Sequence, residues 1–182
     1  MKITLAGSPG SGKSTLRKLL AEHYGLSTKG TGDFMRKLSA KYGYSDITQF
    51  LVEYVSVHPE VDHQVDEEQR IFGKENDYFV LDAHLGFHFV PDSIRICLIC
   101  DLEEAARRIL DDSGRTTETA TNIKDSIVSS QKRRDTMHEN FMSLYQVDID
   151  DHSNFDLVLD TTSLSSDEVF ERASAFIDLQ RT

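Results

Sequence analysis

The sequence is poor in residues that mark several common protein classes. Its 182 residues include no tryptophan, two cysteines and three prolines. No apolar run approaches the roughly 18 residues that a membrane span needs, and residues 1–6 open a strand rather than a signal peptide. We therefore expect a cytoplasmic protein without a membrane partner.

Basic residues are also scarce. Twenty Lys and Arg face 31 Asp and Glu, for a formal net charge of −11. Because nucleic-acid binding depends on clustered basic side chains, we expect no nucleic-acid partner. The length and the 38% hydrophobic content fit one globular domain over residues 1–182. The sequence does not indicate an oligomeric state.

The two cysteines, Cys97 and Cys100, form a C-x-x-C pair that suggests a metal or redox site. They lie within the largely apolar run 94–100, and no second Cys or His pair stands at zinc spacing. We interpret them as small buried side chains on a core strand.

The sequence does contain a complete phosphate-binding loop. Residues 7–14 read Gly-Ser-Pro-Gly-Ser-Gly-Lys-Ser, which matches G-x-x-x-x-G-K-[ST]. The glycines let successive N–H groups turn inward toward phosphate oxygens. Lys13 is expected to reach the β- and γ-phosphates and Ser14 to ligate Mg²⁺. A plain glycine-rich turn would not need Lys13-Ser14 at this spacing, so we predict that the chain binds a nucleoside triphosphate.

Short apolar runs alternate with helical stretches along the chain. The runs predict strands near 2–6, 26–29, 78–82, 94–100 and 155–160. Asp101 with Glu104, and Ser165 with Glu168, have the spacing that begins a helix. The pattern predicts an α/β fold, a three-layer α/β/α P-loop domain with a five-stranded parallel sheet. Two long helical excursions, 33–75 and 112–147, are expected to carry substrate contacts or a lid.

No N-K-x-D motif of switch GTPases is present, and the chain is short for a motor, which favours a small kinase. The segment Thr31-Gly32-Asp33-Phe34-Met35-Arg36 resembles the (T/A)-G-[DE]-x-x-R segment of nucleoside monophosphate kinases. The stretch 145–161, YQVDIDDHSNFDLVLDT, looks like the ending of the short, archaeal-type cytidylate kinases. The resemblance runs from residue 1 to about 175. It implies that ATP with Mg²⁺ is the donor and CMP or dCMP the acceptor, that insertion 33–75 closes on the acceptor, and that a lid closes on ATP.

The same resemblance implies roles for individual residues. The ATP phosphates would be held by Gly7, Ser8, Pro9, Gly10, Ser11, Gly12, Lys13, Ser14 and Thr15. The acceptor would meet Asp33, Arg36 and the position of His84, and Mg²⁺ would be held by Ser14 and Asp82. Lys13, Arg108 and Arg133 would stabilise the transferring phosphoryl group. Other interpretations stay open: a surface helix residue for Arg36, a helix cap or turn residue for Asp82, and surface ion pairs for Arg108 and Arg133.

The chain departs from the family pattern at several positions. Ala83-His84-Leu85 replaces Gly-Arg-Leu, so a permanently charged arginine becomes a histidine. The family's second lid arginine falls on Asp112. The family also has a long helix with the pattern RExSExxRY, whose glutamate falls on Arg134 and whose final Arg-Tyr pair falls on Asn140-Phe141. Arg115, Lys132 and Arg134 are candidates to compensate. These departures leave two alternatives: a kinase with another nucleotide or a hydroxyl-bearing acceptor, and a nucleotide-binding regulatory protein with weak transfer.

Two further groups receive a structural interpretation. His58, Asp62, His63 and Asp66 suggest a metal cluster, but they lie on a polar stretch of the acidic insertion, and we interpret them as a solvated face. The run 148–151 lacks the spacing of a calcium loop, and we interpret it as structural.

Overall fold

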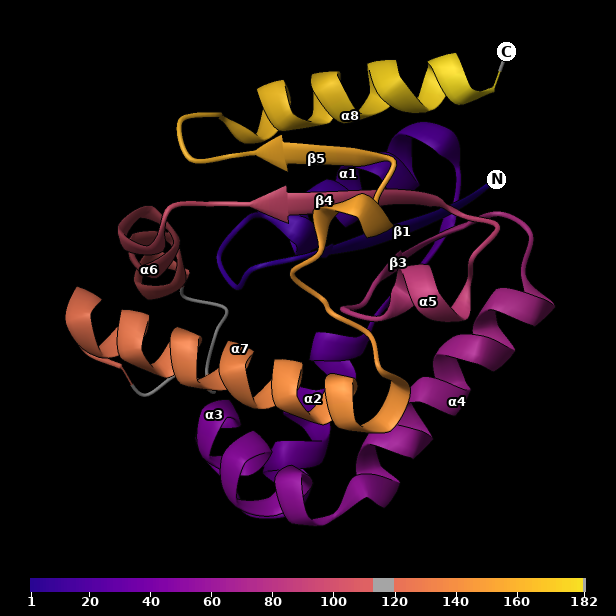
Figure 1. Ribbon diagram of the computed structural model, residues 1–182. Helices are drawn as coiled ribbons and strands as arrows, with labels where there is room; N and C mark the ends of the chain where they lie inside the picture. Colours follow the sequence, from indigo (N-terminus) through magenta and orange to yellow (C-terminus); the bar gives the residue numbers. More distant parts are fainter. Residues whose placement is uncertain (113–119, 182) are drawn as a thin grey trace.

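A five-stranded parallel sheet forms the centre of the molecule, as the computed structural model of residues 1–112 and 120–181 shows (Figure 1). The strands are β1 (Lys2–Gly7), β2 (Ser27–Gly30), β3 (Phe79–Asp82), β4 (Ile94–Ile99) and β5 (Leu157–Asp160). Their order is β2-β3-β1-β4-β5, and every neighbouring pair is parallel. All five predicted strands are confirmed, with ends that differ by at most two residues.

One face of the sheet is covered by α1 (Lys13–Tyr24) and α8 (Ser166–Gln180). Side chains alternate along a strand, so Ile3 and Leu5 of β1 both point to this face. There they pack with Leu20 of α1 and with Ala173 and Ile177 of α8. This layer is the main apolar core.

The opposite face is covered by α4 (Pro59–Glu75), α5 (Gly86–Phe89) and α7 (Ile123–Tyr145). Phe72 of α4 packs on Phe79 of β3, and Phe141 of α7 belongs to the apolar cluster of Ala6. Helix α6 (Leu102–Asp111) lies beside α7 at one end of the sheet (Figure 1). The predicted three-layer arrangement is therefore confirmed.

The excursion between β2 and β3 is helical, as predicted. It consists of α2 (Thr31–Lys41), α3 (Ile47–Gln49), a π turn (Phe50–Tyr54), a 3-10 turn (Val55–Val57) and α4. The excursion has an apolar cluster of its own, separate from the clusters on the sheet. Its members are Ile47, Phe50, Leu51, Val55 and Val61. The second excursion contains α7, while residues 113–119, including the candidate Arg115, lie outside the described residues.

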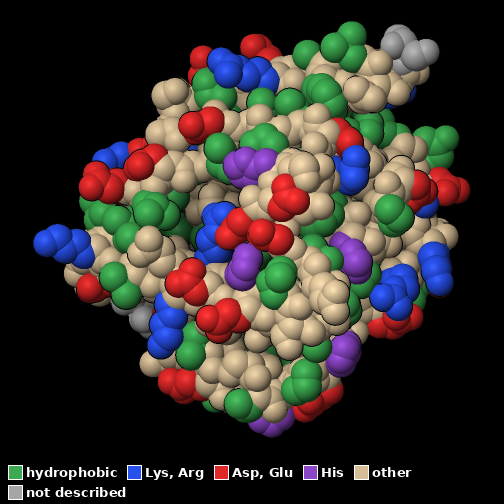
Figure 2. Space-filling view, viewed as in Figure 1, with side chains coloured by type: hydrophobic (Ala, Val, Ile, Leu, Met, Phe, Trp, Pro, Cys, Tyr) green, Lys and Arg blue, Asp and Glu red, His purple; other side chains and the backbone are tan. Residues whose placement is uncertain are grey.

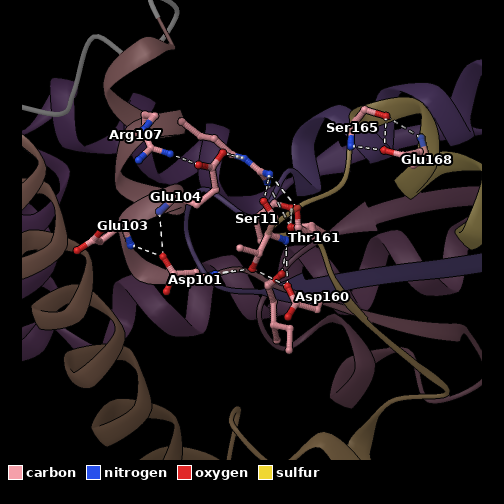
Figure 3. A network of polar contacts seen from close by, with 12 residues as sticks. Ser11, Asp101, Glu103, Glu104, Arg107, Asp160, Thr161, Ser165 and Glu168 are labelled. Carbon is pink, nitrogen blue, oxygen red and sulfur yellow. Dashed lines mark hydrogen bonds and ion pairs between the residues drawn. The ribbon is translucent and has the colours of Figure 1, made fainter.

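The predicted helix caps are present. The Asp101 carboxylate accepts hydrogen bonds from the backbone of Glu103 and Glu104, and Ser165 and Glu168 bond reciprocally in a capping box (Figure 3). A 3-10 turn, His152–Asn154, precedes β5. Within residues 1–112 and 120–181, none of the helices has the length and apolar character of a membrane span.

The structure confirms the cysteine interpretation for Cys97 and in part for Cys100. Cys97 is buried in β4 and Cys100 is partly buried just after it. Burial raises the pKa of Cys97 to about 11 and also raises that of Cys100. Both thiols are therefore protonated at neutral pH, which fits packing side chains and not a reactive pair.

Candidate active site

The phosphate-binding loop joins β1 to α1 at the carboxyl-end edge of the sheet. Gly7, Gly10 and Gly12 have φ angles of 126°, 78° and 91°, which side chains rarely tolerate. A Cβ on Gly7 would lie 1.9 Å from the carbonyl oxygen of Leu98, and one on Gly10 would lie 2.5 Å from that of Ala105. The loop can curl this tightly only because these positions are glycine.

Two side chains of this loop have the geometry for phosphate and metal chemistry. The Lys13 Nζ donates to the carbonyl oxygens of Gly7 at 2.9 Å and Ser8 at 2.7 Å, so the ammonium lies over the loop. The Ser14 hydroxyl donates to Asp82 Oδ2 at 3.1 Å. Asp82 ends β3, next to β1, so parallel pairing brings these two oxygen ligands together. Paired hard oxygen donors suit Mg²⁺, and the residues therefore fit the predicted metal.

The predicted acceptor segment forms the start of α2. Asp33 accepts hydrogen bonds from Arg36 at 2.8 Å and from Arg17 of α1 at 2.9 Å. Burial opposes ionisation of Asp33, but these two guanidinium groups outweigh it and lower the pKa of the carboxyl. Asp33 thus holds Arg36 in place, and Arg36 is not an isolated surface side chain.

Arg17 is a site residue that the sequence analysis missed. It is 8% exposed, and its Nε has no hydrogen-bond partner among the described residues. It lines the same hollow as Lys13 and Arg36. Its position four residues after Lys13, on the loop-facing side of α1, was the available signal.

His84 and Arg133 lie together beside Lys13. Burial lowers the pKa of His84 to about 3, and the charges of Lys13, Arg133 and Arg134 act in the same direction. Arg133 is 7% exposed and lines the same cavity as His84. His84 is therefore a neutral hydrogen-bonding group, while Arg133 supplies a buried positive charge in the same cavity.

Arg108 of α6 is held by groups of its own helix and of the segment after β5. It donates to Glu104 at 2.9 Å and to the carbonyl oxygens of Thr161 at 2.8 Å and Thr162 at 3.2 Å. The buried Thr161 hydroxyl in turn donates to the carbonyl oxygen of Ser11 in the phosphate-binding loop. Arg108 lines the hollow outside the loop, and its predicted role in transfer stays a prediction.

The interpretation of Asp62 and Asp66 as a solvated face is wrong. They are 9% and 4% exposed and lie on the buried side of α4 with Val61, Val65 and Gln69. Burial raises the pKa of Asp62 to about 6, with the Asp66 carboxylate adding to the rise, and burial also raises the pKa of Asp66. The repeat of polar residues at i, i+4 and i+7 was a signal of one shared face. His58 and His63 do not join a metal cluster with them among the described residues.

The acidic run 148–151, which precedes β5, contacts basic side chains of α7. Asp150 forms an ion pair with Arg134, and Asp148 and Asp150 lie 3.5 Å from His138. Figure 2, viewed from the same side as Figure 1, shows acidic, basic and histidine side chains gathered in the middle of the visible face. Arg134 therefore faces Asp150, which agrees with a structural interpretation of the run.

Two hollows meet at the end of the phosphate-binding loop. The outer one runs along the loop and the start of α1 and is lined by Gly10, Gly12, Lys13, Ser14, Thr15, Arg17, Lys18, Asp33, Arg36, Arg108 and Asp112. The inner one, here called the acceptor cavity, lies between α2, α4 and α7. Its lining residues include Lys13, Ser14, Asp33, Met35, Arg36, Ile47, Leu51, Asp62, Val65, Asp66, Gln69, Asp82, His84, Arg133, Met137 and Phe141. Lys13, Ser14, Asp33 and Arg36 belong to both.

Comparison with known proteins gives matches along most of the chain. A family model described as "AAA domain" matches residues 3–129. The S-adenosylmethionine-dependent nucleotide dehydratase of Lacinutrix mariniflava is 33% identical over 172 residues, which cover 92% of this chain but 34% of that protein. This chain thus spans about a third of the length of that relative. The cytidylate kinase of Pyrococcus horikoshii is 32% identical over 177 residues, covering 97% of this chain and 88% of the relative.

The fold also matches solved kinase structures. Shikimate kinase from Acinetobacter baumannii, in complex with shikimate, superposes with a TM-score of 0.59 at 17% identity, covering 98% of this chain and 93% of that one. At this identity the likeness shows the fold alone.

Proposed function

This chain belongs to the cytidylate kinase family of P-loop proteins, and from this membership we propose that it is an ATP-dependent nucleoside monophosphate kinase acting on CMP or dCMP. The relative that dehydrates nucleotides contains a region similar to this chain, which favours a nucleotide acceptor over an unrelated metabolite.

The observation that carries the proposal is the meeting of the two hollows at Lys13 and Ser14. A donor triphosphate held by the loop and an acceptor phosphate held by Arg36 would approach each other there. Bringing two reactants into line in this way removes much of the entropic cost of a bimolecular step.

Transfer needs no covalent enzyme intermediate. An oxygen of the acceptor phosphate attacks the γ-phosphorus in line, the bond to the β,γ-bridging oxygen breaks, and ADP leaves. Lys13 and the N–H groups of the loop stabilise the charge on the donor, while Arg36 and Arg133 hold the acceptor phosphate. Neutral His84 can donate a hydrogen bond to the same phosphate without adding charge beside Lys13.

Ser14 and Asp82 would hold Mg²⁺, directly or through water, because their oxygens lie side by side. When bound, the ion would neutralise charge on the β- and γ-phosphate oxygens.

A turnover assay tests the proposal. The protein is incubated with Mg-ATP and CMP, dCMP, UMP, AMP or hydroxyl-bearing metabolites, and ADP formation is followed. We expect turnover with CMP or dCMP and a loss of at least about 100-fold in Lys13→Ala, because a main source of charge stabilisation is removed. Lys37→Ala, which removes an exposed lysine of α2, is the matched control and should keep full activity.

Activity only with a non-nucleotide acceptor would contradict the proposal. Saturable ATP binding without transfer to any acceptor would favour the second candidate, a nucleotide-binding regulatory protein. The observation behind that candidate is that the guanidinium of Arg108 is held by Glu104, Thr161 and Thr162.

A further inference from the structure

Three polar side chains of α4 form one wall of the acceptor cavity. Asp62, Asp66 and Gln69 are 9%, 4% and 3% exposed, and all three line the cavity. Burying such groups costs free energy unless hydrogen bonds replace the lost water. Their hydrogen-bond partners therefore show what they are suited to bind.

Both carboxylate oxygens of Asp66 accept a hydrogen bond within the protein. Its Oδ2 accepts a hydrogen bond from the Tyr145 hydroxyl at 2.5 Å, and its Oδ1 accepts one from Gln69 Nε2 at 3.1 Å. Tyr145 is the last residue of α7, so this pair joins α4 to the end of α7. Asp66 thus fixes the orientation of the Gln69 amide.

Asp62 and Gln69 keep acceptor oxygens that the protein leaves almost unused. Within the described part of the chain, Asp62 receives one long hydrogen bond, from Asn140 Nδ2 at 3.5 Å. The Gln69 Oε1 is buried and has no hydrogen-bond partner among the described residues. Two acceptors on one cavity wall call for a ligand that brings hydrogen-bond donors.

The cavity also has a cationic end. Lys13 of the phosphate-binding loop, Arg36 of α2 and Arg133 of α7 line it, whereas Asp62, Asp66 and Gln69 all come from α4. The cationic groups and the acceptor-rich wall thus come from different elements. Apolar side chains complete the lining, among them Met35, Ile47 and Leu51. A phosphate matches the cationic end, the flat faces of a base match the apolar lining, and a polar base edge matches the acceptor-rich wall.

We propose that Asp62 and Gln69 select the base of the acceptor by accepting hydrogen bonds from the exocyclic amino group of cytosine. The amino group at C4 offers two N–H donors, and the wall offers two acceptors. Uracil places a carbonyl oxygen at C4, which would face the same acceptors and be repelled. Asp66 and Tyr145 act as positioning residues. This inference rests on the proposed nucleoside monophosphate acceptor.

Calorimetric binding without ATP tests base selection independently of phosphoryl transfer. We expect the wild-type protein to bind CMP and dCMP about 100-fold more tightly than UMP, since a site built for a donor rejects an analogue that lacks it. In Asp62→Asn the side chain keeps its shape and offers both a donor and an acceptor. The preference for CMP over UMP should then fall to within about 10-fold.

Two further variants sharpen the result. Glu67→Gln neutralises an exposed carboxylate on the same helix and should leave the preference unchanged. Gln69→Leu, with its fold checked by circular dichroism, removes the unpaired oxygen and should weaken CMP binding more than UMP binding.

Equal weakening of CMP and UMP in Asp62→Asn, with dCMP unaffected, would mean that the wall holds ribose hydroxyls, and it would overturn the inference. So would wild-type binding of UMP as tight as that of CMP. Selective CMP binding without turnover would leave the inference standing and contradict the proposed kinase activity, so the two failures can be told apart.

Discussion

At the scale of single residues, the position of Arg17 depends on a missing side chain. A Cβ on Gly30 would lie 2.2 Å from Arg17 Nη1 and 3.1 Å from Asp33 Oδ2. Gly30 ends β2, and its backbone is extended, so glycine is not needed there for its backbone freedom. It is needed because the guanidinium passes directly over it.

We therefore expect Gly30→Ala to lower acceptor affinity and to leave the fold intact. The clash is with the far end of a flexible side chain, which can move away, so the loss of stability should be small, within about 1 kcal/mol. Moving Arg17 removes one of the two guanidinium groups that hold Asp33, and Arg36 loses its alignment. The KM for CMP should rise about 10-fold or more, with the KM for ATP changed less.

A double-mutant cycle checks the cause. If Gly30→Ala acts through Arg17, the substitution should have little further effect in an Arg17→Ala background. Additive effects of the two changes would contradict this explanation.

At the scale of one element, the buried face of α4 should make stability depend on pH. Burial raises the pKa of Asp62 to about 6, above the ordinary value of 3.8 that it would regain on unfolding. The folded state therefore binds more protons between those values, and Asp62 lowers the free energy of unfolding as the pH rises through that window. Asp62→Asn abolishes this loss.

We expect the variant to be more stable than the wild type at pH 7.5 and to gain little at pH 4. The gain has a ceiling of roughly 3 kcal/mol, because each pKa unit corresponds to about 1.4 kcal/mol. Urea unfolding at the two pH values measures it. Asp33 and Asp156 have lowered pKa values, so they raise the free energy of unfolding as the pH rises. Both the wild type and the variant contain them, so their contribution cancels in the stability difference between the two. A difference that stays constant with pH would contradict the prediction.

At the scale of the whole molecule, the sequence predicts what depends on local pattern and on sheet topology. The apolar runs predict all five strands, and parallel pairing explains why Ser14 and Asp82 meet although 68 positions separate them. The sequence does not predict that the polar side of α4 is buried and lines the acceptor cavity. A polar stripe beside Val61 and Val65 is typical of a solvated helix face, and only tertiary packing turns it toward a cavity. The burial of Arg17 likewise depends on tertiary packing, and its spacing from Lys13 indicates only that it shares the loop-facing side of α1.

The helical insertion should also respond to ligands separately from the sheet. Its apolar cluster of Ile47, Phe50, Leu51, Val55 and Val61 is distinct from the core that α1 and α8 form on the sheet. Segments with their own cluster can open locally, at less cost than global unfolding. A ligand in the acceptor cavity would bridge α2 and α4 of the insertion to the edge of the sheet, whereas a nucleotide on the loop would touch α1.

Hydrogen exchange should separate these two responses. We expect CMP to slow amide exchange in residues 47–69 by at least about 10-fold, and a non-hydrolysable ATP analogue to slow it mainly in residues 7–24. Lys13→Ala should abolish the second effect and leave most of the first, since the residues that would hold the base lie on α4. Slowing of the same size in both segments with either ligand would indicate global stabilisation instead, and would contradict an insertion that closes as its own unit.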